Sequence, residues 1–238
     1  MCSFCEFGAK ISGSNEAIDR EFVNSMMANG VNTKDCKGLT PLHHAIQKNL
    51  PEMVEKLIEN GADPKIGQSP FELAVLLQQY QVVELLLKSY DINELKSTLN
   101  TNFVAFTVLH FDDGSKMAKL LFDHGFLDPN DESMVSWMQL AIPIDRQDWV
   151  RLFLNHGFEI DKVIGPSGKT GLHEAVNLRN LEIAQLFIQH GASLRSRNSD
   201  GNTTFEHICI LLAGGGGEQF DPRTIGMFKN IMYLESDI

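Results

Sequence analysis

An internal repeat is the feature that most constrains the fold of this chain. The segment GLTPLHHA at Gly38–Ala45 recurs as GKTGLHEA at Gly168–Ala175. In both copies a glycine, Gly61 or Gly191, stands 21 residues after the threonine and ends an apolar segment. Because a motif and an internal distance both recur, we interpret the chain as an array of similar structural units.

The same 21-residue distance identifies weaker copies of the unit. Measured back from Gly157 it reaches Ser136, and from Tyr90, which stands at the glycine position, it reaches Ser69. Measured back from Gly125 it reaches Val104, where the opening motif is lost. The units therefore start near residues 40, 69, 104, 136, 170 and 203, in steps of 29, 35, 32, 34 and 33. The short first step predicts a truncated turn before Ser69.

Each unit has the local signals of a helical hairpin. Thr40 is a helix-capping residue, and Pro41 suits the first helical position because that position needs no amide donor. A second helix is expected over Glu52–Asn60, where apolar residues recur at i, i+3 and i+4. Gly61 supplies a left-handed stop. One such hairpin cannot bury its apolar face alone, so neighbouring units must stack.

A period near 33 residues and the signature T-P-L-H-x-A make this chain resemble the ankyrin repeat family over residues 15 to 213. The resemblance implies an all-α fold, an ankyrin-repeat solenoid of stacked helix-turn-helix units with short hairpin-like turns. We expect an N-terminal capping partial repeat at residues 1–31 and repeats over 32–213. Residues 214–238 are expected to form a Gly-rich loop and a C-terminal capping helix that starts at Asp221-Pro222.

Composition narrows the functional classes. Thirty-one acidic and 20 basic residues give a net charge of −11, which disfavours binding to nucleic-acid phosphates or to an anionic membrane surface. No apolar stretch has the length and composition of a membrane span, and no signal peptide is recognised at the start. Four cysteines do not form a disulfide framework in a chain this long. These features predict a cytoplasmic protein, with delivery into a host cytosol by a pathogen as the alternative.

Several short motifs resemble chemical sites, and each has a simpler structural interpretation. Gly165–Thr170 suggests a phosphate-binding loop, but only two residues separate its glycines where the motif needs four. His110–Asp112 has the spacing of two iron ligands, for which His124 or His156 would have to converge as a third. Gly214–Gly217 lacks the spacing of a phosphate cradle and is interpreted as a connector. We therefore expect no catalytic residue, metal or cofactor.

The remaining motifs lie at the ends of the chain and in the repeat signature. Cys2–Cys5 is a single C-x-x-C pair, open to interpretation as a packed terminus, a redox or lipidated site, or half of a zinc site. In the resembled family the signature histidine, here His43 and His173, is a structural residue that bonds the adjoining loop. Ser236 and Ile238 have the pattern of a C-terminal ligand for a PDZ domain.

The resemblance implies a noncatalytic interaction module or adaptor, which binds another protein through turn tips and the concave face of the first helices. The alternatives are a pathogen effector acting on a host protein, and an enzyme with a pocket beside the degenerate third repeat. The family's contact positions fall here on Cys36, Lys37, Leu39, Gln47, Lys48, Glu132, Ser133, Val135, Ile144, Pro166, Ser167, Lys169, Asn177, Leu178, Ser199, Asp200 and Asn202.

Overall fold

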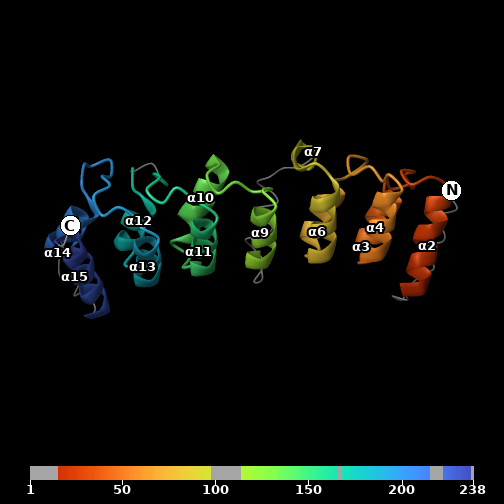
Figure 1. Cartoon of the computed structure of the whole chain (residues 1–238). Helices are drawn as coiled ribbons and strands as arrows, with labels where there is room; N and C mark the ends of the chain where they lie inside the picture. Colours follow the sequence, from red (N-terminus) through yellow and green to blue (C-terminus); the bar gives the residue numbers. More distant parts are fainter. Residues whose placement is uncertain (1–15, 98–113, 166–167, 215–221, 237–238) are drawn as a thin grey trace. The chain divides into compact units, whose positions relative to one another are not determined.

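The computed structural model describes residues 16–97, 114–165, 168–214 and 222–236 (Figure 1). The regular elements in these ranges are α-helices, and the short turns between them contribute two isolated β-bridges, Val163 with Thr170 and Arg197 with Thr203. The all-α class with hairpin-like turns, predicted from the sequence, is therefore confirmed. Backbone contacts divide the chain into two compact parts, with the boundary between Leu127 and Asp128. We call these parts the first and the second unit, and we call the repeated helical pairs within them repeats.

The first unit is built from successive helical pairs. Helix α3 packs against α2, α4 and α5, while α4 packs against α6 and α6 against α9, so first helices stack on first helices and second helices on second. The helices are α2 (Glu16–Ala28), α3 (Pro41–Gln47), α4 (Pro51–Glu59), α5 (Pro70–Leu76), α6 (Tyr80–Ser89), α7 (Ile92–Ser97) and α9 (Gly114–Asp123).

The second unit continues the same pattern. Helix α12 packs against α13 and α14, α11 packs against α13, and α15 closes the end of the unit against α13 and α14. The predicted C-terminal helix is present and has proline at its first position. The helices are α10 (Glu132–Ala141), α11 (Gln147–Asn155), α12 (Gly171–Asn177), α13 (Leu181–Gln189), α14 (Thr204–Gly214) and α15 (Pro222–Ser236).

Left-handed residues set the two chain reversals of a repeat. The predicted glycine stops have positive φ, with values of 82° at Gly61 and 90° at Gly191. The turn between first and second helices also uses a left-handed residue, at Asn49, Gln78, Asp145 and Arg179, with φ between 53° and 60°. Each of these four residues stands nine positions after the start of its repeat, so these repeats share one register.

Two departures from the regular unit have local causes. Helix α10 begins four residues before Ser136, because Asp131 stands at its N-cap and neither glycine nor proline interrupts the helix. Ser136 therefore lies inside the helix, where its hydroxyl donates to the carbonyl of Glu132 at 3.1 Å. Tyr90 replaces the glycine stop with extended backbone, and its hydroxyl donates to the carbonyl of Ala62 at 2.5 Å.

The core of each unit lies between stacked helices. In the first unit the rings of Phe71 and Phe126 stack with centroids 4.9 Å apart, and both side chains are buried. In the second unit Trp149 is buried, with its ring centroid 5.8 Å from that of Phe153. No helix in the described part of the chain combines the length and apolarity needed to cross a membrane.

Candidate functional site

The first helices that follow Thr40, Ser69, Ser136 and Thr170 separate core positions from exposed positions by the same rule, and the last repeat, from Thr203, is placed in the same register. The residues two, five and six positions after the starting Thr or Ser face the core, as Leu42, Ala45 and Ile46 do in α3. The residues four, seven and eight positions after it are exposed or half-buried, and we call them the first-helix face. This face comprises His44, Gln47, Lys48, Leu73, Leu76 and Leu77 in the first unit, and Leu140, Pro143, Ile144, Glu174, Asn177, Leu178, His207 and Ile210 in the second.

A buried carboxylate holds the turn that precedes α3. One oxygen of Asp35 accepts the backbone N–H groups of Lys37 at 2.8 Å and Leu39 at 2.9 Å, and the other lies 3.0 Å from Nε2 of His44. Burial alone would raise the pKa of Asp35, but these hydrogen bonds hold it below its usual value. The turn is thereby fixed to the first helix, while Lys37 at its tip stays exposed.

The two signature histidines join neighbouring units. Nδ1 of His43 accepts the backbone N–H of Thr40 at 3.1 Å, so the ring proton sits on Nε2, which donates to the carbonyl of Gln68 at 2.7 Å. His173 repeats this arrangement with the hydroxyl of Thr170 and the carbonyl of Asn202. Burial lowers the pKa of both histidines, which favours the neutral ring that these bonds require. The predicted structural role is confirmed.

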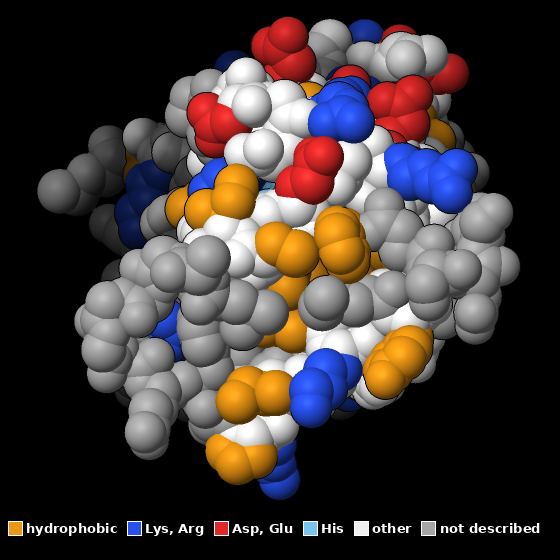
Figure 2. Space-filling model, turned by 90° about the vertical axis from the view of Figure 1, so that its left-hand side faces the viewer, with side chains coloured by type: hydrophobic (Ala, Val, Ile, Leu, Met, Phe, Trp, Pro, Cys, Tyr) orange, Lys and Arg blue, Asp and Glu red, His pale blue; other side chains and the backbone are white. Residues whose placement is uncertain are grey.

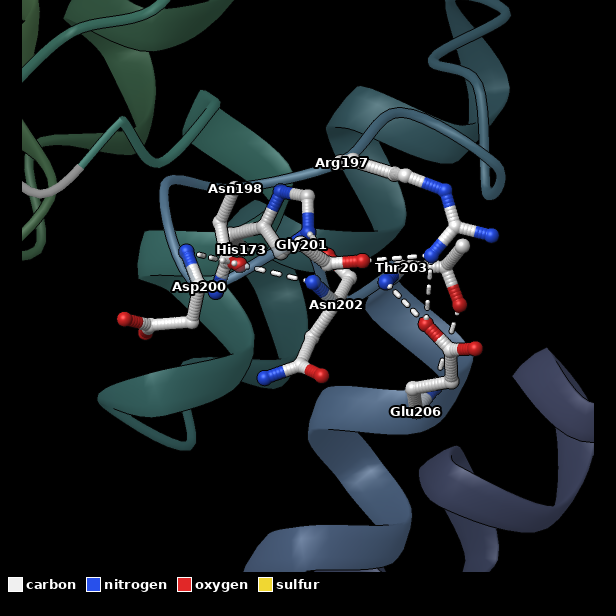
Figure 3. A network of polar contacts seen from close by, with 8 residues as sticks. All are labelled: His173, Arg197, Asn198, Asp200, Gly201, Asn202, Thr203 and Glu206. Atoms are coloured by element: carbon white, nitrogen blue, oxygen red, sulfur yellow. Dashed lines mark hydrogen bonds and ion pairs between the residues drawn. The ribbon is translucent and has the colours of Figure 1, made fainter.

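The turn before α14 is closed by a different set of side chains (Figure 3). Oδ1 of Asn198 accepts the backbone N–H groups of Asp200 and Asn202, each at 3.0 Å. Glu206, which replaces the signature histidine, accepts the N–H of Thr203 at 2.7 Å and pairs with Arg197 at 3.1 Å. The turn therefore satisfies its own backbone, and the carboxylate of Asp200 points away from it.

Exposed aliphatic side chains gather on the first-helix face of the second unit. The exposed fractions are 63% for Ile144, 54% for Leu140, 50% for Ile210 and 43% for Leu178. Figure 2 looks onto the C-terminal end of this unit, where hydrophobic side chains occupy the middle of the view and acidic and basic side chains lie above them. Since the repeat framework already buries the core positions, these side chains are free to contact another molecule.

The structure describes most of the predicted contact residues. Cys36 and Lys37 are exposed at a turn tip, Gln47 and Lys48 at the end of α3, and the sulfur of Cys36 is disulfide-bonded. Leu39, Asn177 and Asn202 are half-buried, whereas Ile144, Leu178, Ser199 and Asp200 are exposed. Glu132, Ser133 and Val135 lie in the first turns of α10 and not in a turn tip, because that helix starts early. Pro166, Ser167 and Ile238 lie outside the described residues, as does the side chain of Ser236.

The motifs that suggested chemistry take structural positions where they are described. Lys169 belongs to the turn before α12, where its carbonyl accepts the N–H of Ile164 and its ammonium lies 3.7 Å from Glu174. His124 and His156 each bond through Nδ1 to the carbonyl four residues earlier. Within the described ranges no three His, Cys, Asp or Glu side chains are grouped to hold a metal ion. Cys2–Cys5, His110–Asp112 and the region near Val104 lie outside them.

The geometry defines a class of helical repeat proteins: stacked helical pairs, left-handed glycine stops and, in two repeats, a buried histidine that bonds the turn of the next repeat. A family model of three ankyrin repeats matches residues 11–97, and a model of one ankyrin repeat matches residues 167–199. The two models together cover half of the chain. The chain belongs to the ankyrin repeat family.

Three curated proteins are similar in sequence. The nuclear factor NF-kappa-B p105 subunit of Gallus gallus is 26% identical over 83% of this chain, and the B-cell lymphoma 3 protein homolog of Mus musculus is 27% identical over 69%. A putative ankyrin repeat protein of Rickettsia bellii is 26% identical over 72%. The matches cover 21%, 31% and 20% of these proteins, so the chain spans a fifth to a third of their length.

A solved structure supports the same fold. The ankyrin repeat domain of Bcl-3, described as a member of the IkappaB protein family, aligns with a TM-score of 0.54 at 20% sequence identity. The alignment covers 90% of this chain and 92% of that chain.

The sequence interpretation missed part of the exposed surface. Leu140 and Ile210 were not among the predicted contact residues, although they stand four and seven positions after the starting residues of their repeats. A signal for Ile210 was present, because Gln47 and Asn177 were selected at the seventh position of their repeats. Applying the seventh position to the last repeat would have identified Ile210, whereas no residue at the fourth position was selected, so Leu140 was recognised only from its exposure in the structure.

Proposed function

We propose that the chain is a noncatalytic adaptor, which binds a partner protein through its first-helix faces and turn tips. The observation that carries the proposal is the shared register of the first helices. Core positions are apolar in each described repeat, whereas the exposed positions change from His, Gln and Lys in α3 to Leu in α5 and to a mixture of Leu, Ile, Pro, Glu, Asn and His in the second unit. Such a pattern suits a constant framework with a variable recognition surface.

The turn tips support binding because their geometry is fixed in advance. Asp35 in the first unit and Asn198 in the second each accept two backbone N–H groups of their own turn. A surface that is already ordered loses less conformational entropy when a partner binds. Exposed Lys37 and Asp200 at these tips are therefore presented on rigid supports.

The noncatalytic part of the proposal rests on how the perturbed groups are used. Burial lowers the pKa of His43 and His173, but both rings are engaged by backbone groups of the framework. Tyr90, whose pKa burial raises to about 12, donates its hydroxyl to a backbone carbonyl. An active site would instead gather such groups around a common pocket.

Affinity capture from a cell lysate tests the proposal. Lys37→Glu with Lys48→Glu alters a turn tip and the first-helix face of the first unit. The matched control is Lys56→Glu with Lys119→Glu on second helices. All four lysines are exposed, so each variant changes the charge equally without disturbing the core. We expect a stoichiometric protein partner that the control retains and the face variant loses. Capture that is equal for both variants would contradict binding through this face.

The cellular setting and the pathogen-effector alternative stay predictions. The similar proteins come from a bird, a mouse and a rickettsia, so similarity alone does not select a host or a pathogen origin. The net charge of −11 predicts a neutral or basic partner whose association slows as salt increases.

A further inference from the structure

We propose that the first-helix face of the second unit binds an amphipathic α-helix of a partner protein, with one apolar side and neutral or basic flanks. This inference rests on the proposed adaptor function and specifies the partner segment that one part of the surface accepts. Four exposed aliphatic residues carry it: Leu140, Ile144, Leu178 and Ile210, which we call the aliphatic row.

The aliphatic row extends over three successive repeats. Leu140 lies in the last turn of α10 and Ile144 just after that helix, Leu178 is the C-cap of α12, and Ile210 lies in α14. Each side chain is at least 43% exposed, whereas the neighbouring core positions Ile142 and Val176 are fully buried. Each repeat thus adds at least one apolar contact point at its own first helix, outside its core.

The spacing of the row favours a helix over an extended segment. Packed helices lie about 8–10 Å apart. Helix α12 packs directly against α14, so their contact points Leu178 and Ile210 are expected to recur at about that distance. Residues i and i+7 of an α-helix are about 10.5 Å apart and lie on one face, two turns from each other. A strand covers about 10 Å in three residues, but an odd step places the side chains on opposite faces. A helix of about 15 residues would therefore reach all three repeats.

Charge on this surface favours a partner without acidic flanks. Glu174 is the only Asp, Glu, Lys or Arg among the first-helix-face residues of the second unit, and it pairs with Lys169. Asp145, next to Ile144, is exposed and accepts hydrogen bonds from the side-chain amides of Asn180 and Gln147, which carry no positive charge. Residues 128–214 contain eleven Asp and Glu against seven Lys and Arg, so the surrounding field attracts basic side chains.

The test is selection of peptides from a display library of random 20-residue sequences, panned against the full chain. We expect the enriched peptides to carry large apolar residues at i, i+3 or i+4, and i+7, with Lys or Arg beside them. A synthetic copy of an enriched peptide should gain helical circular dichroism on binding. Its Kd should rise severalfold between 50 and 500 mM salt, because screening weakens the charge attraction.

Matched variants locate the site. Ile144→Ser with Leu178→Ser should weaken binding of the synthetic peptide at least tenfold, while Val163→Ser, which alters an aliphatic residue that is 48% exposed in a turn, should stay within twofold. All of these positions are exposed, so each variant should fold like the wild type.

Three outcomes of the peptide experiments would overturn the inference: no enrichment, enriched peptides without the helical pattern, or binding that the double variant retains. Self-association of the chain that Ile144→Ser with Leu178→Ser abolishes, measured by sedimentation, would assign the row to a second copy and also overturn it. Failure of this helix-binding inference is distinguishable from failure of the adaptor function, because lysate capture lost with Lys37→Glu and Lys48→Glu depends on the first unit.

Discussion

Gly171 provides the sharpest test of how the second unit is packed. It stands at the first position of α12, where α3 and α5 have proline, and it is buried. A Cβ atom placed on Gly171 would lie 2.1 Å from Cζ of Phe187, and 2.5 and 2.9 Å from two further ring atoms. Its φ is not left-handed, so the obstacle to a side chain is steric and not conformational.

The expected loss in the free energy of unfolding follows from the distances between the added Cβ and the ring of Phe187. Carbon atoms in contact normally stay about 3.5–4.0 Å apart, so the ring of fully buried Phe187 would have to move by more than about 1 Å. Overpacking of this kind costs about 1–3 kcal/mol, against a gain in helix propensity of at most about 1 kcal/mol. We therefore expect Gly171→Ala to lower the free energy of unfolding by about 1–2 kcal/mol. Gly171→Pro, which restores the repeat signature, should destabilise at least as much.

Urea denaturation followed by circular dichroism measures the effect. The matched control is Gly226→Ala in α15, where an added Cβ meets no atom within 4 Å, and a gain of about 0.5–1 kcal/mol is expected. Combining Gly171→Ala with Phe187→Leu should cost less than the sum of the two single changes, because the smaller side chain vacates the contested space. A stabilising Gly171→Ala, or strict additivity with Phe187→Leu, would refute the packing argument.

Three other predictions concern the framework. Burial lowers the pKa of His43 and His173 in the folded protein, so the unfolded chain binds more protons than the folded protein as the pH falls below about 6.5. The free energy of unfolding should therefore decrease from pH 7.5 to 5.5, and it should decrease less steeply in the double variant His43→Gln with His173→Gln. Asn130→Ala removes two hydrogen bonds to a neighbouring turn: Asn130 donates to the carbonyl of Gly157 at 2.9 Å and accepts the N–H of Glu159 at 2.8 Å. The change should lower the thermal midpoint by an amount equivalent to about 1–3 kcal/mol, and an unchanged midpoint would contradict this role. Tyr90→Phe leaves the carbonyl of Ala62 unpaired and should cost about 1 kcal/mol in urea denaturation, whereas no loss would show that solvent replaces the bond.

The regular parts of the fold could be predicted because each depends on local residue types. Thr40 and Pro41 start a helix, Gly61 ends the next one, and apolar residues at helical spacing identify the face that must be buried. Two copies of this pattern were enough to predict stacked units, since a single hairpin cannot cover its own apolar surface. The structural role of His43 also followed from the repeated signature.

The tertiary structure decided what local signals do not encode. Helix α10 begins at Glu132 although Ser136 looks like a start, because a helix boundary depends on which competing cap is used. Position 171 requires glycine because the ring of Phe187, distant in sequence, occupies the space that a side chain there would need. The exposure of Leu140 and Ile210 depends equally on stacking, since an apolar residue becomes a binding surface only where no neighbouring helix covers it. The sequence by itself therefore determined the repeated unit, whereas contacts between units decided which of its apolar side chains remain exposed to solvent.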